Sequence, residues 1–353
     1  MNRNNHDMGY WQDIFKRAHL IILAMLLSVA GSIVGTAVQA ASSAVIIMYH
    51  RFGESDYPAT NTTVEQLDTH IQELTTGGYT VLPVAQIVTR LAAGTDLPDR
   101  TVGITIDDAY RSVFTVAWPK FKSAGLPITV FVATGHVDQG SSRHLTWDQV
   151  REMRDGGATI GHHTVSHLHM VKASPERLAR EIDDAFERFD AKIGQRPGLF
   201  AYPYGEANLA TMATVKKAGF VAAFGQHSGV VGNTDGQYYL PRFAMNETYG
   251  DLARLRLAAN ALPLVVTDVT PPDHQIGDDN PPAMGFTIAR QIGSLSNLAC
   301  FLSHAGRARV ERLEPRIEVR IDKPFPQGRT RLNCTLRTAS GRWRWYGRQF
   351  YRP

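Results

Sequence analysis

The sequence predicts an α/β fold, in which a distorted (β/α) barrel of about seven units is followed by a small all-β, sandwich-like C-terminal module. Short apolar runs alternate with amphipathic helical patterns from residue 44 to about 260, which indicates a parallel sheet covered by helices. After residue 282, short alternating segments separated by Pro and Gly indicate antiparallel strands. The 353 residues are 43% hydrophobic and 20% charged, which excludes a disordered, collagen-like or disulfide-packed chain.

Residues 1–40 have the pattern of an export signal. Lys16 and Arg17 precede an apolar run over 20–38, and the small residues Ala40 and Ala41 follow it. We expect a secretory signal peptide that is cleaved after Ala40. The run is about 19 residues long, so an uncleaved membrane anchor is the alternative. In either case the protein is exported, being periplasmic, secreted or anchored to the membrane by this segment.

The barrel domain is expected over 41–262. The run 44–49 is apolar throughout and too short for a helix, which is typical of a strand buried on both faces. Thr62 and Glu65 form a capping-box pattern that begins a helix, and a longer helix runs from Ser174 to Gly194. Further strand candidates are 79–82, 102–106, 128–133, 158–161, 199–202 and 219–224.

A Pro- and Asp-rich segment separates the barrel from the C-terminal module. We expect a linker over 263–282 and the β-rich module over 283–353, with strands at 316–321 and 331–336. The only cysteines, Cys300 and Cys334, lie in the module, where a disulfide is expected and two buried thiols are the alternative.

The C-terminal end of the module is strongly basic. Residues 306–353 hold 13 basic and 4 acidic side chains. In an exported protein such a surface favours contact with an anionic envelope polymer or a membrane surface, and no nucleic-acid partner is expected. The alternating Arg and aromatic residues at 342–346 also fit a strand with one apolar face and a soluble outer face.

Titratable side chains follow several of the expected barrel strands. His50 follows the first strand, Asp107 and Asp108 follow 102–106, and His163 and His167 follow the strand near 160. Parallel α/β folds place their sites at these carboxyl ends. One carboxylate and two imidazoles can form a facial metal triad, and a second carboxylate can act as a general base. Alone, the carboxylates would fit a turn or a helix cap, and the histidines would fit solvated or core positions.

Three segments resemble the motifs of polysaccharide deacetylases, the NodB-homology group of carbohydrate esterase family 4. They are Thr105-Ile106-Asp107-Asp108, His163-Thr164-Val165-Ser166-His167 and Phe200-Ala201-Tyr202-Pro203-Tyr204-Gly205. The resemblance covers about 44–260. In this family a divalent metal ion, usually zinc or a similar ion, activates the water that attacks the N-acetyl carbonyl of an aminosugar.

Matched by position, the resemblance implies a role for each motif residue. Asp107 corresponds to the catalytic base, and the metal ligands are Asp108, His163 and His167. The backbone N–H of Tyr204 corresponds to the donor that stabilises the developing oxyanion.

The sequence departs from the family pattern at two points. Ala201 stands where many members have an arginine that orients the base, and Arg242 is a candidate substitute, with a surface arginine as the alternative. The general acid is not specified by a motif. His50 fits if the barrel is permuted so that its closing strand comes first, and His227 is the reserve candidate. Family members often carry this acid as a histidine in a Leu-x-His pattern after a late strand. His304 stands in such a pattern but lies in the C-terminal module, so we do not expect it to be the acid.

The function predicted from the sequence is metal-dependent N-deacetylation of a glycan that contains N-acetylglucosamine. Chitooligosaccharide, peptidoglycan and exopolysaccharide are the candidate substrates, and the sequence does not choose among them. The sequence contains neither the G-x-S-x-G pattern of a serine hydrolase nor the H-E-x-x-H pattern of a zinc protease. The rival function is a non-catalytic envelope carbohydrate-binding protein built on the same barrel.

Overall fold

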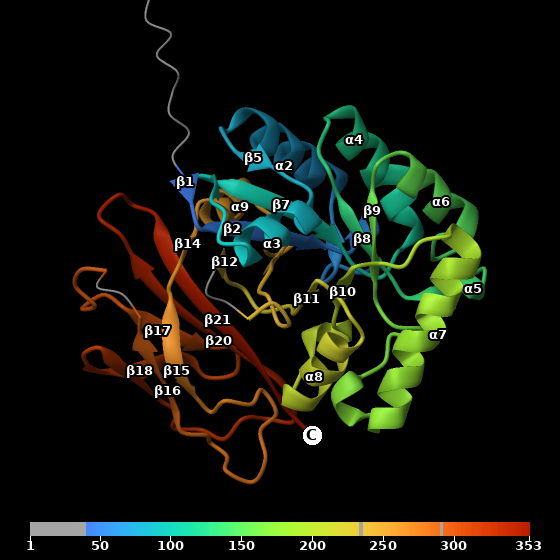
Figure 1. Cartoon of the computed structure of the whole chain (residues 1–353). Coiled ribbons are helices and arrows are strands. Elements are labelled where there is room, and N and C mark those ends of the chain that lie inside the picture. Colours follow the sequence, from blue (N-terminus) through green and yellow to red (C-terminus); the bar gives the residue numbers. More distant parts are fainter. Residues whose placement is uncertain (1–39, 233–235, 290–291) are drawn as a thin grey trace, which may run out of the picture. The chain divides into compact units, whose positions relative to one another are not determined.

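The computed structural model describes residues 40–232, 236–289 and 292–353 (Figure 1). The apolar run 20–38, expected to be a leader or an anchor, lies outside the described residues. Within them, no helix has the length and apolar character that a membrane span requires.

A closed ring of parallel strands forms the first part of the described chain. Successive neighbours pair in parallel from β2 to β11, Phe224 at the end of β11 bridges Leu240, and β13 returns to pair in parallel with β2. The ring strands are β2 (Ser43–Tyr49), β7 (Thr101–Ile106), β8 (Thr129–Val132), β9 (Thr159–His162), β10 (Leu199–Ala201), β11 (Ala222–Phe224) and β13 (Phe243–Ala244). The predicted barrel is therefore confirmed, and β2, the first strand of the ring in sequence, lies beside β13, the last.

Helices cover the outside of this ring (Figure 1). They are α2 (Val64–Thr76), α3 (Val84–Ala92), α4 (Trp118–Ser123), α5 (Thr134–Asp138), α6 (Trp147–Asp155), α7 (Pro175–Ile193), α8 (Leu209–Lys217) and α9 (Leu252–Ala259). Short elements complete the domain: β1 (Ala40–Ala41), β3 (Arg51–Phe52), β4 (Asn61–Thr62), β5 (Thr80–Val81), β6 (Leu97–Pro98), β12 (Val231–Gly232), η1 (Val113–Ala117), η2 (Met170–Lys172) and η3 (Pro203–Gly205).

The structure contains both helices that the sequence predicted most specifically, and one of them begins at a different residue. Helix α7 begins after the N-cap Ser174 and ends at Gly194, which adopts the left-handed conformation. Helix α2 begins one residue later than predicted, because Thr63 and Gln66 form the capping box in place of Thr62 and Glu65. Both pairs satisfy the capping-box pattern, and Thr62 is already engaged by β4.

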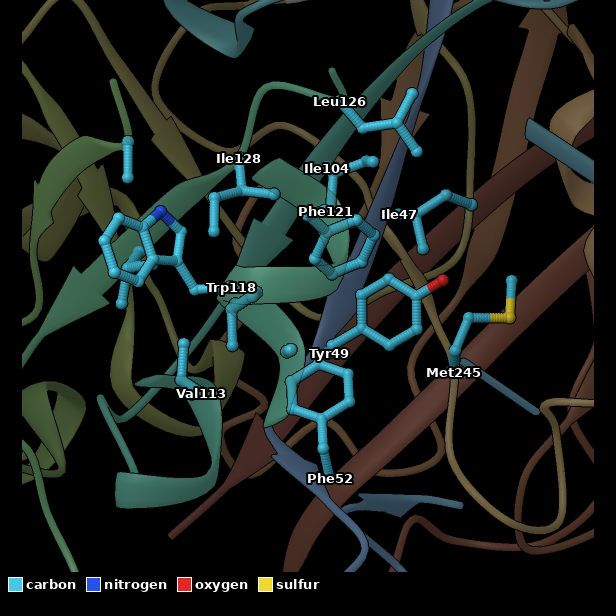
Figure 2. Close-up of a cluster of buried hydrophobic side chains, with 14 of the residues drawn as sticks. Ile47, Tyr49, Phe52, Ile104, Val113, Trp118, Phe121, Leu126, Ile128 and Met245 are labelled. Carbon is cyan, nitrogen blue, oxygen red and sulfur yellow. The ribbon is translucent and has the colours of Figure 1, made fainter. Parts of the chain in front are cut away.

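A large hydrophobic core lies between the strands and the helices. Figure 2 shows Ile47, Ile104 and Ile128 packed against Trp118 and Phe121 from the segment that contains α4. Because both faces of these strands are covered, β2 and β7 are almost wholly buried. This packing holds the carboxyl ends of the strands in place.

The C-terminal module is a single eight-stranded sheet. In spatial order it comprises β14 (Leu262–Pro263), β21 (Trp343–Arg352), β20 (Gly328–Arg337), β17 (Ala299–Leu302), β18 (Gly306–Leu313), β19 (Arg316–Arg320), β16 (Met284–Ile288) and β15 (Val266–Thr270). Side chains from both halves, including Phe286 and Phe350, share one core. The structure contains the expected disulfide, since Cys300 and Cys334 lie opposite each other on β17 and β20.

Part of the segment that was expected to be a linker forms β-strands. Residues 266–270 form β15, an edge strand that pairs with β16, and residues 262–263 form β14 beside β21. Proline is tolerated at strand edges, so the Pro-rich composition did not reveal these strands.

Three arginines of β21 make contacts within the protein. Arg342 binds Asp99 of the barrel at 3.0 Å, and Arg344 donates to the carbonyl of Pro263. Arg348 is buried and donates to the carbonyl of Pro272. These side chains therefore join the module to the barrel and to its own edge.

Candidate active site

Asp108, His163 and His167 converge at one end of the barrel. Asp108 follows β7, and the two histidines follow β9, which lies two strands away in the sheet. Oδ1 of Asp108 lies 3.2 Å from Nε2 of His163 and 3.2 Å from Nε2 of His167. Among the described residues, these three side chains form a cluster whose ligand atoms are close enough together to hold one metal ion.

The donor atoms of this cluster fit a divalent cation. His163 places Nδ1 2.7 Å from the carbonyl of Ala201, so Nδ1–H donates there and the lone pair of Nε2 faces Asp108. Within the described residues, neither Oδ1 of Asp108 nor Nε2 of His163 has a hydrogen-bond partner of acceptable geometry, although both are buried. Two acceptors this close require a proton or a cation between them. The carboxylate and imidazole set suits Zn²⁺ or a similar ion.

The electrostatics of the triad agree with this interpretation. Burial would raise the pKa of Asp108, but the imidazoles of His163 and His167, each 3.2 Å away, hold that pKa well below its usual value. Burial alone would lower the pKa of His163, whereas its contact with Asp108 raises it. Asp108 is therefore an anion that must share a cation or a proton with its neighbours.

Backbone strain is concentrated around the triad. Seven non-glycine residues of the described ranges have positive φ, and five of these lie at this site: Asp108, Ala109, Thr164, His167 and Tyr204. Each such conformation costs about 1–3 kcal/mol and persists only where surrounding contacts enforce it. The backbone at these residues therefore adopts unfavourable angles, which direct their side chains towards the site.

Asp107 and Arg242 form a fully buried ion pair beside the triad. Arg242 donates Nη1–H to Oδ1 of Asp107 at 2.7 Å and Nη2–H to Oδ2 at 2.8 Å. Its Nε–H donates to the carbonyl of Gly225, so the guanidinium is held on two sides. Burial would raise the pKa of Asp107, but Arg242 outweighs it and the pKa is lowered. Arg242 therefore lies in the interior, and the surface alternative does not hold.

The structure separates the two candidate acids. His50 Nε2 lies 3.9 Å from Oδ2 of Asp107, and burial lowers the pKa of His50. His227 instead lines a cavity of about 400 Å³ together with Tyr239 and Arg348, and that lining includes no member of the metal triad. Burial, assisted by Arg348, lowers the pKa of His227 to about 3. Geometry favours His50.

Tyr204 lies against the triad on another side. Its ring meets that of His167 edge-on at 4.3 Å and stacks on His169 at 3.8 Å. Tyr204 occupies the short η3 turn, and among the described residues its backbone N–H donates to no other backbone group. That N–H is therefore free to act as a donor.

The sequence analysis did not single out several other residues near the triad. His136 lies 6.1 Å from His167 between ring centroids, and the ring of His144 stacks on His136 at 4.6 Å. Tyr110 stacks on His144, and the guanidinium carbon of Arg51 lies 3.5 Å from the centroid of the Tyr110 ring. Burial lowers the pKa of His144 to about 4, so this aromatic group is uncharged at neutral pH apart from Arg51. His136 could have been found, because it also follows a strand end.

A family model described as polysaccharide deacetylase matches residues 94–223, a range that includes Asp107, the triad and Tyr204.

This range of the chain matches the polysaccharide deacetylase family.

Curated proteins with deacetylase names are similar to part of this chain. YxkH of Bacillus subtilis (strain 168), named for the same family, is 27% identical over 197 residues, which are 56% of this chain and 69% of YxkH. The poly-beta-1,6-N-acetyl-D-glucosamine N-deacetylase of Staphylococcus aureus (strain MSSA476) is 25% identical over 162 residues. That match covers 42% of this chain and 56% of the relative, so much of the relative remains uncompared.

Solved structures support the same fold. The deacetylase PplD of Streptococcus pyogenes, in complex with acetate, is 25% identical with a TM-score of 0.57. The match covers 62% of this chain and 98% of PplD. IcaB from Ammonifex degensii has a TM-score of 0.54 at 23% identity and covers 62% and 97% of the two chains. Nearly all of each neighbour is therefore matched by about three fifths of this chain.

Proposed function

We propose that this protein is a metal-dependent hydrolase that removes N-acetyl groups from N-acetylglucosamine-containing poly- or oligosaccharides. The observation that carries the proposal is the convergence of Asp108, His163 and His167 beside the buried Asp107. The match of residues 94–223 to the polysaccharide deacetylase family supports it. The name of the Staphylococcus aureus relative favours an exopolysaccharide of β-1,6-linked N-acetylglucosamine among the candidate substrates.

The proposed chemistry assigns a separate task to each side chain. Asp108, His163 and His167 would hold a divalent ion, zinc or a similar metal, which when bound lowers the pKa of water and polarises a carbonyl. Asp107 is the general base. Its low pKa keeps it ionised at neutral pH, and Arg242 fixes both carboxylate oxygens without touching substrate. Arg242 thus performs the orienting task that an arginine at position 201 would perform.

His50 and Tyr204 complete the proposed site. His50 lies beside Asp107, with Nε2 3.9 Å from Oδ2, and in its protonated form it would deliver a proton to the leaving amine. The free backbone N–H of Tyr204 would donate to the oxyanion that develops on the attacked carbonyl. Together these groups would divide acid, base and oxyanion stabilisation between different strands of one barrel.

Acetate release from a panel of glycans tests this proposal. The panel comprises N-acetylglucosamine oligomers with β-1,4 and β-1,6 linkages and peptidoglycan fragments, each with and without chelator. We expect release from at least one substrate, loss with chelator and recovery on addition of Zn²⁺. Glycan binding without acetate release at any metal concentration would instead establish a carbohydrate-binding protein.

The proposal includes a place of action outside the cytoplasm. The leader pattern of residues 1–40 and the disulfide between Cys300 and Cys334 support it. Contact with an anionic envelope polymer or a membrane surface would involve arginines exposed on β18, such as Arg307 and Arg309, because Arg348 is buried. Replacing both exposed arginines with glutamine should weaken salt-sensitive binding to envelope preparations.

A further inference from the structure

The η3 turn beside the metal triad has a conformation that the chain would not adopt unaided. Tyr204 and Gly205 are consecutive residues with φ of 59° and 66°. A side chain at position 205 would lie 2.5 Å from the backbone nitrogen of Gln226, so the turn packs closely on the next strand end. Since a tyrosine in the left-handed region is strained, other contacts must hold this turn.

Side-chain donors hold the turn through its two carbonyl groups. Gln349 donates Nε2–H to the carbonyl of Gly205 at 2.8 Å and to that of Tyr204 at 3.1 Å. Tyr239 donates its hydroxyl to the carbonyl of Gly205 at 2.6 Å, and Arg329 reaches the carbonyl of Tyr204 at 3.3 Å. Tyr239 belongs to the barrel, whereas Gln349 and Arg329 lie on β21 and β20 of the C-terminal module.

Gln349 is itself held in one orientation. It is 1% exposed, and Nε–H of Arg331 donates to its Oε1 at 3.0 Å. Arg331 and Gln349 lie opposite each other in the pairing of β20 with β21. Because Arg331 occupies the acceptor end of the amide, the donor end must face the two carbonyls of the turn. The module thus presents a prearranged donor to the turn.

We propose that Gln349 is a positioning residue for the deacetylation reaction, through which the C-terminal module holds the Tyr204 turn in its working conformation. This inference rests on the proposed function, because it assumes that the Tyr204 N–H acts on the reacting carbonyl. The module would then be part of the active-site framework and not only a separate binding unit. Loss of its support would let the turn relax, and small displacements of a donor reduce the rate strongly.

Substitution of Gln349 tests the inference. Gln349→Met keeps the volume but removes both donors, and Gln349→Glu keeps the contact with Arg331 but turns an acceptor towards the carbonyls. We expect kcat to fall about tenfold or more in both variants, with KM within about twofold and metal content unchanged. Thr330→Val is the matched control, because Thr330 is equally buried on β20 and its hydroxyl has no partner within the described residues. It should retain the kcat of the original protein.

A second measurement does not depend on catalysis. Hydrogen–deuterium exchange of the peptide that spans 199–209 should be faster in Gln349→Met than in the original protein and in Thr330→Val, while other barrel peptides are unchanged. If no glycan releases acetate, the proposed function fails and exchange alone still decides whether Gln349 holds the turn. Original kcat together with original exchange in Gln349→Met would overturn the inference. Equal losses in the control would show general destabilisation and would overturn it too.

Discussion

Replacing Arg242 with methionine tests the ion pair beneath the site. Both partners are 0% exposed and are joined by two short hydrogen bonds of 2.7 and 2.8 Å. Methionine fills part of the volume but leaves the carboxylate of Asp107 without its cation in the barrel interior. Breaking a buried pair in this way typically costs about 3–5 kcal/mol of folding free energy. We therefore expect Arg242→Met to fold, but with a large loss of stability at neutral pH.

The effect should depend on pH in a defined direction. With Arg242 present, the pKa of Asp107 in the folded state is lowered, so the pair contributes stability above the unfolded pKa of about 3.9 and loses it as pH falls. Without Arg242, burial dominates and raises the pKa of Asp107 above the unfolded value. The folded variant then binds a proton more readily than the unfolded chain. Its stability deficit should grow as pH rises and shrink as pH falls.

Urea unfolding and acetate release, each measured across pH, provide the assay. The acid limb of the rate profile should move to higher pH in Arg242→Met, because the base must be ionised. Arg254→Met is the control, since Arg254 stacks on Phe243 and Trp345 and should affect stability without moving that limb. The double variant Asp107→Asn, Arg242→Met should be more stable than Arg242→Met alone, because no charge remains buried.

Two outcomes would refute this reasoning. One is an acid limb that stays in place in Arg242→Met, which would show that Arg242 does not set the ionisation of the base. The other is a stability deficit that is independent of pH, which would assign the loss to packing alone.

Three further predictions follow from the site and the module. His163→Ala should abolish bound metal, measured by elemental analysis, together with acetate release, and added Zn²⁺ should raise Tm only in the original protein; retained metal would contradict the triad. His50→Ala should remove one limb of the pH–rate profile while His227→Ala keeps it, and the reverse result would make His227 the acid. Replacing Cys300 and Cys334 with alanine should lower the unfolding free energy by about 4 kcal/mol, as expected for a crosslink that spans 34 positions, and an unchanged urea midpoint would argue against this.

Local patterns in the sequence determined the barrel and the chemical residues at its edge. The apolar run before His50 and the strand before Asp107 are each a few residues long, and their burial on both faces follows from the run itself. Once these segments are parallel strands, their carboxyl ends share an edge, so Asp108, His163 and His167 could be expected together. The sequence was less decisive where two overlapping segments fit the same pattern. At the start of α2, both Thr62 with Glu65 and Thr63 with Gln66 fit a capping box, and only the structure shows which pair forms it.

Tertiary structure alone decided which distant residues complete the site. Arg242 meets Asp107 across 135 positions of sequence, and Gln349 meets the carbonyl of Gly205 across 144. No periodicity connects such pairs, because their distance depends on how the barrel closes between β13 and β2 and on how β21 packs beside the η3 turn. The same holds for β15, which becomes a strand because the edge of β16 offers unpaired backbone groups. Composition could describe that segment only as rich in Pro and Asp, since the partner that orders it lies elsewhere in the chain.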